Sequence, residues 1–115
     1  MIKRNIDLSN VENLKSIKVG ELVRSTLTKM LENDMIYEDE IEKMQTLSYS
    51  KRVFDIQYPL LQNVKGINAK PLRYWARPVK THGEYYYICS EWYESAQNDD
   101  RSYFLAWIKN YRNKS

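Results

Sequence analysis

A short stretch at residues 48–59, with the sequence SYSKRVFDIQYP, decides how the chain is interpreted, because it changes from polar to apolar within one helical turn. Ser48 or Ser50 can cap a helix there, since a serine hydroxyl accepts a hydrogen bond from a free backbone N–H of the first turn. Pro59 disfavours helical geometry at Tyr58, so the helix is expected to stop at that point. The stretch therefore predicts a short helix whose first turn directs three side chains outward: Tyr49, Lys51 and Arg52.

Two further helices are predicted upstream of this stretch. In the first, apolar residues recur at the spacing of one buried helix face, and they are Val19, Leu22, Val23, Leu27, Met30 and Leu31. Asn33-Asp34 ends that helix. The second begins with three carboxylates, at residues 38–40, where the helix dipole favours negative charge. Its apolar face is supplied by Ile41, Met44 and Leu47.

Downstream of Pro71 the pattern changes to that of strands. Residues 72–77 and 85–89 are rich in aromatic and other strand-forming residues. Gly83 can adopt the positive φ of a tight turn between them. Pro78 marks the end of the first strand or an exposed edge. Alternation along that strand places three side chains on one face: Arg73, Trp75 and Arg77.

A final helix is predicted after the polar segment 95–100, where Asp99 or Asp100 can serve as the cap. Its apolar face consists of Phe104, Trp107, Ile108 and Tyr111. The whole chain has 115 residues, which is enough for one domain. We expect residues 1–18 to form an N-terminal arm or extra element, and residues 19–115 to form a single α+β domain. Its expected order is three helices, a two-stranded β-hairpin and a C-terminal helix.

Several classes of function are disfavoured by residue types that are rare in this chain. His82 and Cys89 are its one histidine and one cysteine, so a zinc site of the Cys/His type is excluded and no internal disulfide can form. The three glycines are isolated, so a glycine-rich phosphate-binding loop is not expected. We expect no catalytic residues, no metal and no cofactor. The chain also lacks an apolar segment of membrane-spanning length, so we expect a cytoplasmic protein without a membrane partner.

The charges are segregated along the chain although the net charge is only +3. Residues 19–48 contain three basic and seven acidic residues, whereas residues 49–90 contain seven basic and two acidic residues. A basic surface of this kind attracts polyanions by releasing their condensed counterions. It is also compatible with an ordinary solvated surface.

The order of elements resembles that of a winged helix-turn-helix DNA-binding domain. Residues 49–54, followed by Tyr58-Pro59-Leu60, Arg73-Tyr74 and Tyr85-Tyr86-Tyr87, are also similar to small bacterial domains attached to restriction-type or mobile-element proteins. The resemblance implies a winged-helix-like fold whose third helix enters the major groove and whose hairpin, the wing, lies along the neighbouring backbone or minor groove. It also implies a role in transcription regulation.

The candidate DNA-binding residues lie on the third helix and on the hairpin. Basic side chains on these elements can contact phosphates or guanine, and hydroxyl groups at a helix N-terminus can bind a phosphate. The candidates are Ser48, Tyr49, Ser50, Lys51, Arg52, Arg73, Arg77, Lys80 and His82. Structural roles remain open for the same residues: a capped surface helix, guanidinium groups stacked on tyrosine rings in the hairpin, and an exposed histidine at a turn.

The sequence thus predicts a non-enzymatic domain that binds double-stranded DNA. This prediction requires that Lys51, Arg52, Arg73 and Arg77 lie together on one side of the molecule. If they lie apart, a protein–protein interaction module becomes the better interpretation, because Tyr, Trp and Arg are the residues most enriched at binding hot spots. Binding of single-stranded nucleic acid by exposed aromatic rings is a third possibility. The oligomeric state is not indicated by the sequence.

Overall fold

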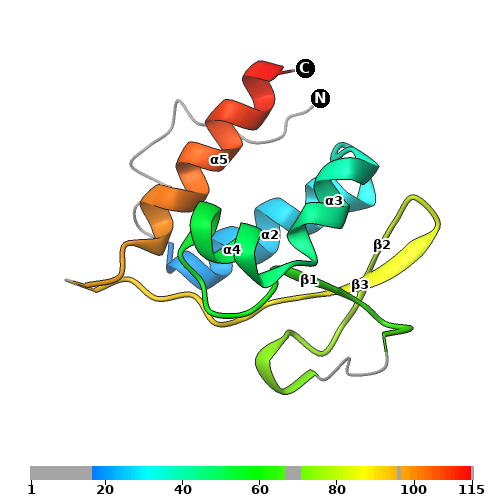
Figure 1. Cartoon of the computed structure of the whole chain (residues 1–115), viewed down its shortest axis with the longest axis horizontal. Helices are drawn as coiled ribbons and strands as arrows, with labels where there is room; N and C mark the ends of the chain where they lie inside the picture. The colour runs from blue at the N-terminus through cyan, green and yellow to red at the C-terminus, as the bar shows by residue number, and fades with distance from the viewer. Residues whose placement is uncertain (1–16, 67–70, 96, 115) are drawn as a thin grey trace.

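The computed structural model describes residues 17–66, 71–95 and 97–114, so the predicted N-terminal arm lies almost entirely outside the described residues. The described part is α+β, as predicted. Its elements are the helices α2 (Val19–Glu32), α3 (Glu38–Met44), α4 (Leu47–Phe54) and α5 (Asp100–Lys114), the strands β1 (Leu61–Asn63), β2 (Val79–Thr81) and β3 (Glu84–Ile88), and a 3-10 turn at Pro71–Arg73. In Figure 1 the helices lie on one side of the sheet, and the β2–β3 hairpin extends at the edge of the molecule.

Helix α2 forms where the apolar spacing predicts it. All six residues of the predicted stripe are buried. The helix ends at Glu32, with Asn33 as its C-cap, and Asp34 then adopts the left-handed conformation with φ of 52°. Helix α2 packs against β2 and against α5, so its buried face joins the sheet to the C-terminal helix.

Helices α3 and α4 are joined by only two residues, Gln45 and Thr46. The predicted boundary between them is wrong. Leu47 begins α4 and is 46% exposed, so it does not complete the apolar face of α3. Thr46 is the N-cap of α4, because its hydroxyl oxygen accepts the backbone N–H of Tyr49 at 3.3 Å. Neither serine proposed for this role caps the helix.

The sheet has three antiparallel strands in the order β1-β3-β2, so the predicted two-stranded hairpin is incomplete. Strand β1 pairs Leu61 with Ile88 along the second edge of β3. The first predicted strand is also misplaced, because residues 71–73 form a 3-10 turn and β2 begins only after Pro78. Residues 75–78 bulge outward between the Tyr74–Cys89 bridge and the Val79–Tyr86 pair.

The turn of the β2–β3 hairpin confirms the prediction at Gly83. His82 and Gly83 both have positive φ, at 49° and 80°, which is the geometry of a two-residue hairpin turn that follows the twist of the strands. Thr81 and Glu84 are the last pair before the turn.

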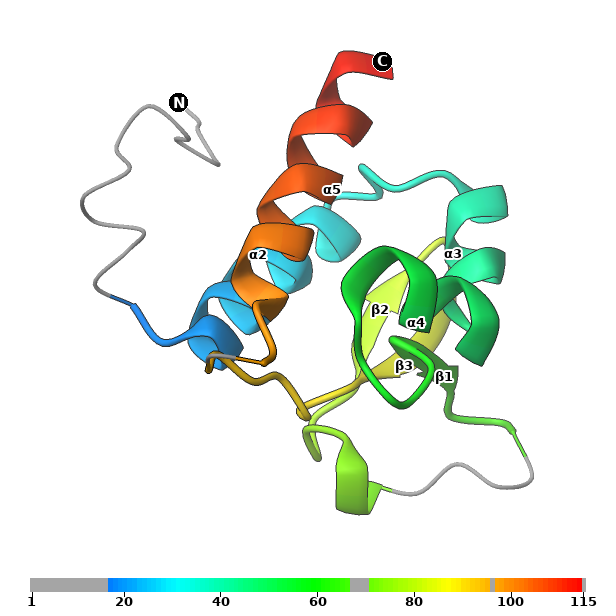
Figure 2. The ribbon, with the colours of Figure 1, turned by 60° about the vertical axis from the view of Figure 1, so that its left-hand side comes forward.

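The centre of the core is aromatic. Phe54 lies 5.6 Å from Trp107 and 5.9 Å from Trp92 between ring centroids, and Phe104 contacts all three rings. Burial of each such side chain contributes about 1.5–3 kcal/mol. These contacts hold α4 against α5, and Figure 2 shows α5 beside α2 with α3 and α4 across from them.

Candidate functional site

The outward face of α4 is positioned by a buried carboxylate on α3. Glu40 is 5% exposed, and its Oε2 atom accepts the hydroxyl group of Tyr49 on α4 and the indole N–H of Trp107 on α5, the latter at 2.9 Å. Two donors from different helices satisfy one buried anion, which removes much of its burial cost. The orientation of α4 relative to α3 and α5 is therefore fixed.

Tyr49 and Ser50 have structural roles that conflict with the predicted DNA contacts. Tyr49 is half-buried, and burial and then the hydrogen bond to Glu40 raise the pKa of its hydroxyl group. Ser50 is fully buried: its Oγ donates to the carbonyl of Met44 at 3.3 Å and accepts the backbone N–H of Leu60 at 2.8 Å. A side chain enclosed in this way cannot reach a phosphate, so the assignment of Ser50 to the interface is wrong.

Three predicted residues do form the outward face of α4: Ser48, Lys51 and Arg52. All three are exposed. The guanidinium group of Arg52 lies 5.4 Å from the ring centre of Tyr49, while no described residue forms a hydrogen bond or ion pair with the side chain of Ser48 or of Lys51. The first turn of α4 contains no acidic residue, so its free N–H groups and dipole favour an anion.

The tip of the β2–β3 hairpin is hydrogen-bonded to the segment that follows α2. This contradicts the expectation that His82 is simply an exposed side chain. Oδ1 of Asp34, just after α2, accepts the backbone N–H of His82 at 2.9 Å and the hydroxyl of Thr81 at 3.2 Å. The His82 ring is half-buried, with Nε2 2.7 Å from the carbonyl oxygen of Ile36. The hydrogen bond from His82 lowers the pKa of the Asp34 carboxyl group. The β2–β3 hairpin is thus anchored at its tip.

The other basic residues of the predicted interface are dispersed. Arg73 lies 5.5 Å from the ring centre of Tyr58 and 3.9 Å from Glu91, so it stacks on a tyrosine that lies outside the hairpin and not in the predicted hairpin stacking. Lys80 is exposed beside the ring of Tyr85, at 6.0 Å from its centre. Arg77 lies in a depression beside α2.

Three of the four cationic residues required on one surface line separate depressions. Arg52 lines a depression with α5, Arg73 lines another with the segment before β1, and Arg77 lines the third with α2. These three depressions have no residue in common. Within the predicted interface, the exposed face of α4 is the part whose residues lie together on one element: Ser48, Lys51 and Arg52.

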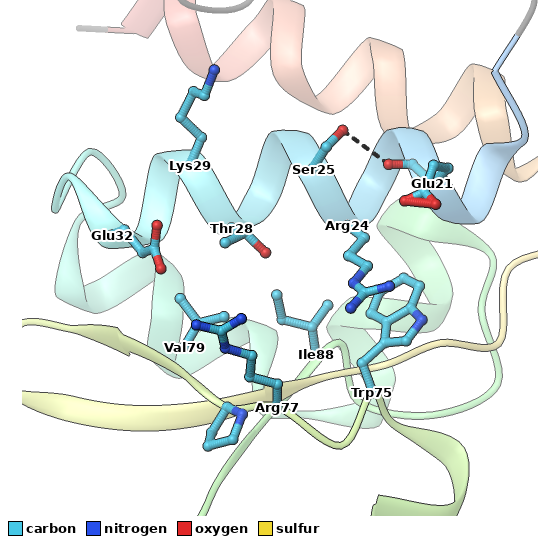
Figure 3. Close-up of a pocket in the computed structure, with 11 residues that line it drawn as sticks. Glu21, Arg24, Ser25, Thr28, Lys29, Glu32, Trp75, Arg77, Val79 and Ile88 are labelled. Atoms are coloured by element: carbon cyan, nitrogen blue, oxygen red, sulfur yellow. Dashed lines mark hydrogen bonds between the residues drawn. The ribbon is translucent and has the colours of Figure 1, made fainter.

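Two residues near Arg77 were not identified from the sequence. Arg24 of α2 stacks on Trp75, with its guanidinium carbon 5.7 Å from the ring centre, and Thr28 lies one turn further along (Figure 3). Both lie on the polar side of α2, at the i and i+4 positions next to the apolar stripe. Arg24 did not stand out in the sequence, because the net charge of residues 19–48 is negative. That net charge conceals a single basic residue on one face of the helix.

The exposed charges of α3 and α4 are mainly of opposite sign, so an anionic ligand is expected to contact α4 and not α3. Helix α3 exposes Glu38, Asp39 and Glu42, with Lys43 as its one cation, whereas α4 exposes Lys51 and Arg52. An anionic ligand approaching this pair is attracted by α4 and repelled by α3.

Comparison with protein-family models, with curated proteins and with solved structures found nothing that matches this chain. Within the described ranges, no group of three His, Cys, Asp or Glu side chains is placed to hold a metal ion. None of the described helices combines the length and apolar character needed to cross a membrane.

Proposed function

We propose that this protein is a non-enzymatic, winged-helix-type domain that binds double-stranded DNA through α4. The observation that carries the proposal is the outward face of α4, where Ser48, Lys51 and Arg52 stand together on a helix fixed by Glu40 and Ser50. The two-residue link between α3 and α4 supports a helix-turn-helix arrangement. A role in transcription regulation in the bacterial cytoplasm is part of the same proposal.

The contact would be made mainly with phosphates. Lys51 and Arg52 are suited to phosphate oxygens, and the hydroxyl of Ser48 in the first turn can donate a further hydrogen bond. Because α4 has only eight residues, it would enter the groove with its N-terminal half. The carboxylates of α3 would keep that helix away from the backbone. Lys80 on the hairpin remains a candidate for a second contact.

The number of cations on α4 sets the expected salt dependence. Two phosphate contacts give a slope of log K against log salt of about −2, whereas five contacts would give about −4 to −5. The dispersal of the other basic residues favours the smaller value. Binding of this kind is expected to be weak and largely independent of sequence, with a dissociation constant of about 10⁻⁴–10⁻⁶ M at physiological salt.

The proposal is tested by charge reversal at one exposed position. Lys51→Glu removes a cation from α4, and the matched control Lys109→Glu makes the same change in net charge on the exposed side of α5, where no described residue pairs with Lys109. Affinity for a fluorescent duplex is measured from about 50 to about 300 mM salt. We expect a loss of about tenfold or more for Lys51→Glu and a much smaller loss for Lys109→Glu. Equal losses, or no binding by the unaltered protein, would refute the proposal.

A protein-docking function is the second candidate, and the separation of Arg52, Arg73 and Arg77 favours it. The exposed carboxylates of α3 lie close in sequence to Tyr37, which is 58% exposed, so a basic partner with an apolar anchor would fit this face. Docking there would not depend on Lys51. A partner that binds Lys51→Glu as tightly as the unaltered protein, while Glu38→Lys or Asp39→Lys abolishes binding, would establish this alternative.

A further inference from the structure

A groove lies between α2 and residues 75–79, which comprise the bulge and the first residue of β2, on a part of the surface that the DNA-binding proposal does not use. Its volume is about 490 Å³, which is in the range of small-molecule sites. The apolar part of its lining comes from the strand side: Trp75, Pro78, Val79 and Ile88. The polar part comes mainly from α2, with Arg77 added from the bulge. Figure 3 shows this combination of an apolar floor and a polar wall.

Two guanidinium groups reach into the groove from opposite walls. In Figure 3, Arg24 extends from α2 toward Trp75 and Arg77 extends from the bulge toward α2, with Thr28 above the space between them. Lys29 also lines the groove, but its side chain is directed away from it. No ion pair within the described chain involves Arg24 or Arg77. The two charges are therefore available to an anion placed between them.

Carboxylates limit the length of a ligand in this groove. Glu21 and Glu32 lie at its two ends (Figure 3). They are 11 residues apart on α2, which corresponds to about 16 Å at the rise of an α-helix. A nucleic-acid backbone running through the groove would bring its phosphates against both carboxylates. A ligand with one anionic group, placed between Arg24 and Arg77, would avoid them.

We propose that this groove binds a mononucleotide. The phosphate lies between the guanidinium groups of Arg24 and Arg77 and accepts a hydrogen bond from the hydroxyl of Thr28. The base lies on the apolar floor formed by Pro78 and Val79, beside the indole of Trp75. This site is separate from α4, so it can exist whether or not the protein binds DNA.

Adenosine 5′-monophosphate is a suitable probe, with adenosine and inorganic phosphate as its two parts. The indole N–H signals in heteronuclear NMR report on the site, because Trp92 and Trp107 donate to protein acceptors at 2.7 and 2.9 Å, whereas Trp75 has no such partner in the described chain. We expect the Trp75 signal to shift with a dissociation constant of about 1 mM or below. Adenosine alone and phosphate alone should each bind about tenfold more weakly.

Variants identify the groups responsible. Arg77→Gln, an exposed position, should weaken binding of adenosine 5′-monophosphate by about tenfold. Arg24→Gln should do the same, and Lys51→Gln on α4 should bind as the unaltered protein does. The proposal is overturned if the probe causes no saturable shift, if both arginine variants bind normally, or if phosphate alone binds as tightly as the nucleotide. A phosphoserine peptide that binds more tightly than the nucleotide would likewise overturn it.

Discussion

Asp34 holds the backbone of His82 from 48 residues away in the sequence. Its carboxylate accepts the His82 N–H at 2.9 Å, and the same oxygen accepts the hydroxyl of Thr81. A residue just after α2 therefore fixes the tip of the hairpin. This relationship restricts the β2–β3 hairpin, because a hairpin anchored at its tip presents one fixed surface to any ligand.

Removing this carboxylate should release the hairpin tip. Asp34→Gly is the informative change, since glycine tolerates the left-handed backbone at this position while lacking the acceptor. Asp34→Asn is the control, because it keeps an acceptor oxygen. Hydrogen exchange of the His82 amide should accelerate clearly in Asp34→Gly and little in Asp34→Asn. Equal exchange rates in the two variants would show that the tip is held by other contacts.

The hydroxyl of Tyr49 should contribute to stability through its hydrogen bond to the buried Glu40 carboxylate. Tyr49→Phe leaves the buried Glu40 carboxylate with Trp107 as its remaining side-chain donor among the described residues, so the free energy of unfolding should fall by about 1–3 kcal/mol. Tyr93→Phe provides the comparison, because Tyr93 is 53% exposed and donates to Glu91 at the surface. Its effect should remain within about 0.5 kcal/mol. Urea unfolding distinguishes the two, and equal effects would contradict the role given to Glu40.

The two serines of α4 should behave in opposite ways. Ser50→Ala removes the acceptor of the Leu60 N–H and should destabilise the protein by about 1–3 kcal/mol. Ser48→Ala affects an exposed position and should change stability by no more than about 0.5 kcal/mol, while weakening any DNA binding. Thermal unfolding and duplex titration of both variants check this. A stable Ser50→Ala variant would disprove the structural role of that hydroxyl.

Asp100 should make stability depend on pH. Burial, followed by the nearby charges of Asp55 and Asp99, raises the pKa of its carboxyl group to about 6. Its Oδ2 accepts the N–H of Tyr93 at 2.8 Å, but Oδ1 is buried without a hydrogen-bond partner among the described residues. The folded state therefore binds the proton more tightly than the unfolded state does. The resulting stabilisation is complete below the unfolded pKa of 3.8 and is lost as the pH rises through about 6.

Asp100→Asn removes this titration. Relative to the unaltered protein, the variant should gain about 1–2 kcal/mol in the free energy of unfolding between pH 5 and pH 7.5, after allowance for solvent screening. The difference between the two proteins is the quantity to measure, because groups common to both cancel. A difference that stays constant across this range would contradict the raised pKa.

The local sequence pattern predicted those elements whose conformation depends mainly on their own residues. The stripe of α2 and the turn at Gly83 are of this kind. Strand β1 was missed because its three residues pair with β3, which lies more than 20 positions away, and carry little pattern of their own. The strand predicted at residues 72–77 failed because two prolines, at 71 and 78, limit regular pairing between them.

The exposure of the candidate polar side chains was predicted less well, because tertiary contacts decide which of them remain at the surface. Thr46 and Ser48 are both good helix caps, and the choice of Thr46 places the side chain of Ser50 in the core. The tie between Asp34 and His82 joins two segments that have no common local signal. Lys51 was placed correctly, since an exposed position near the start of a short helix follows from the helical period alone.

The most direct test of DNA binding by α4 is a map of amide chemical-shift changes during titration of the protein with a DNA duplex. If α4 binds DNA, the largest changes will lie at Leu47, Ser48, Lys51 and Arg52, and they will diminish as salt is raised. Residues of α5 near Lys109 should change little. Changes confined to α3, to the groove beside α2, or absent altogether would contradict the claim that α4 binds DNA.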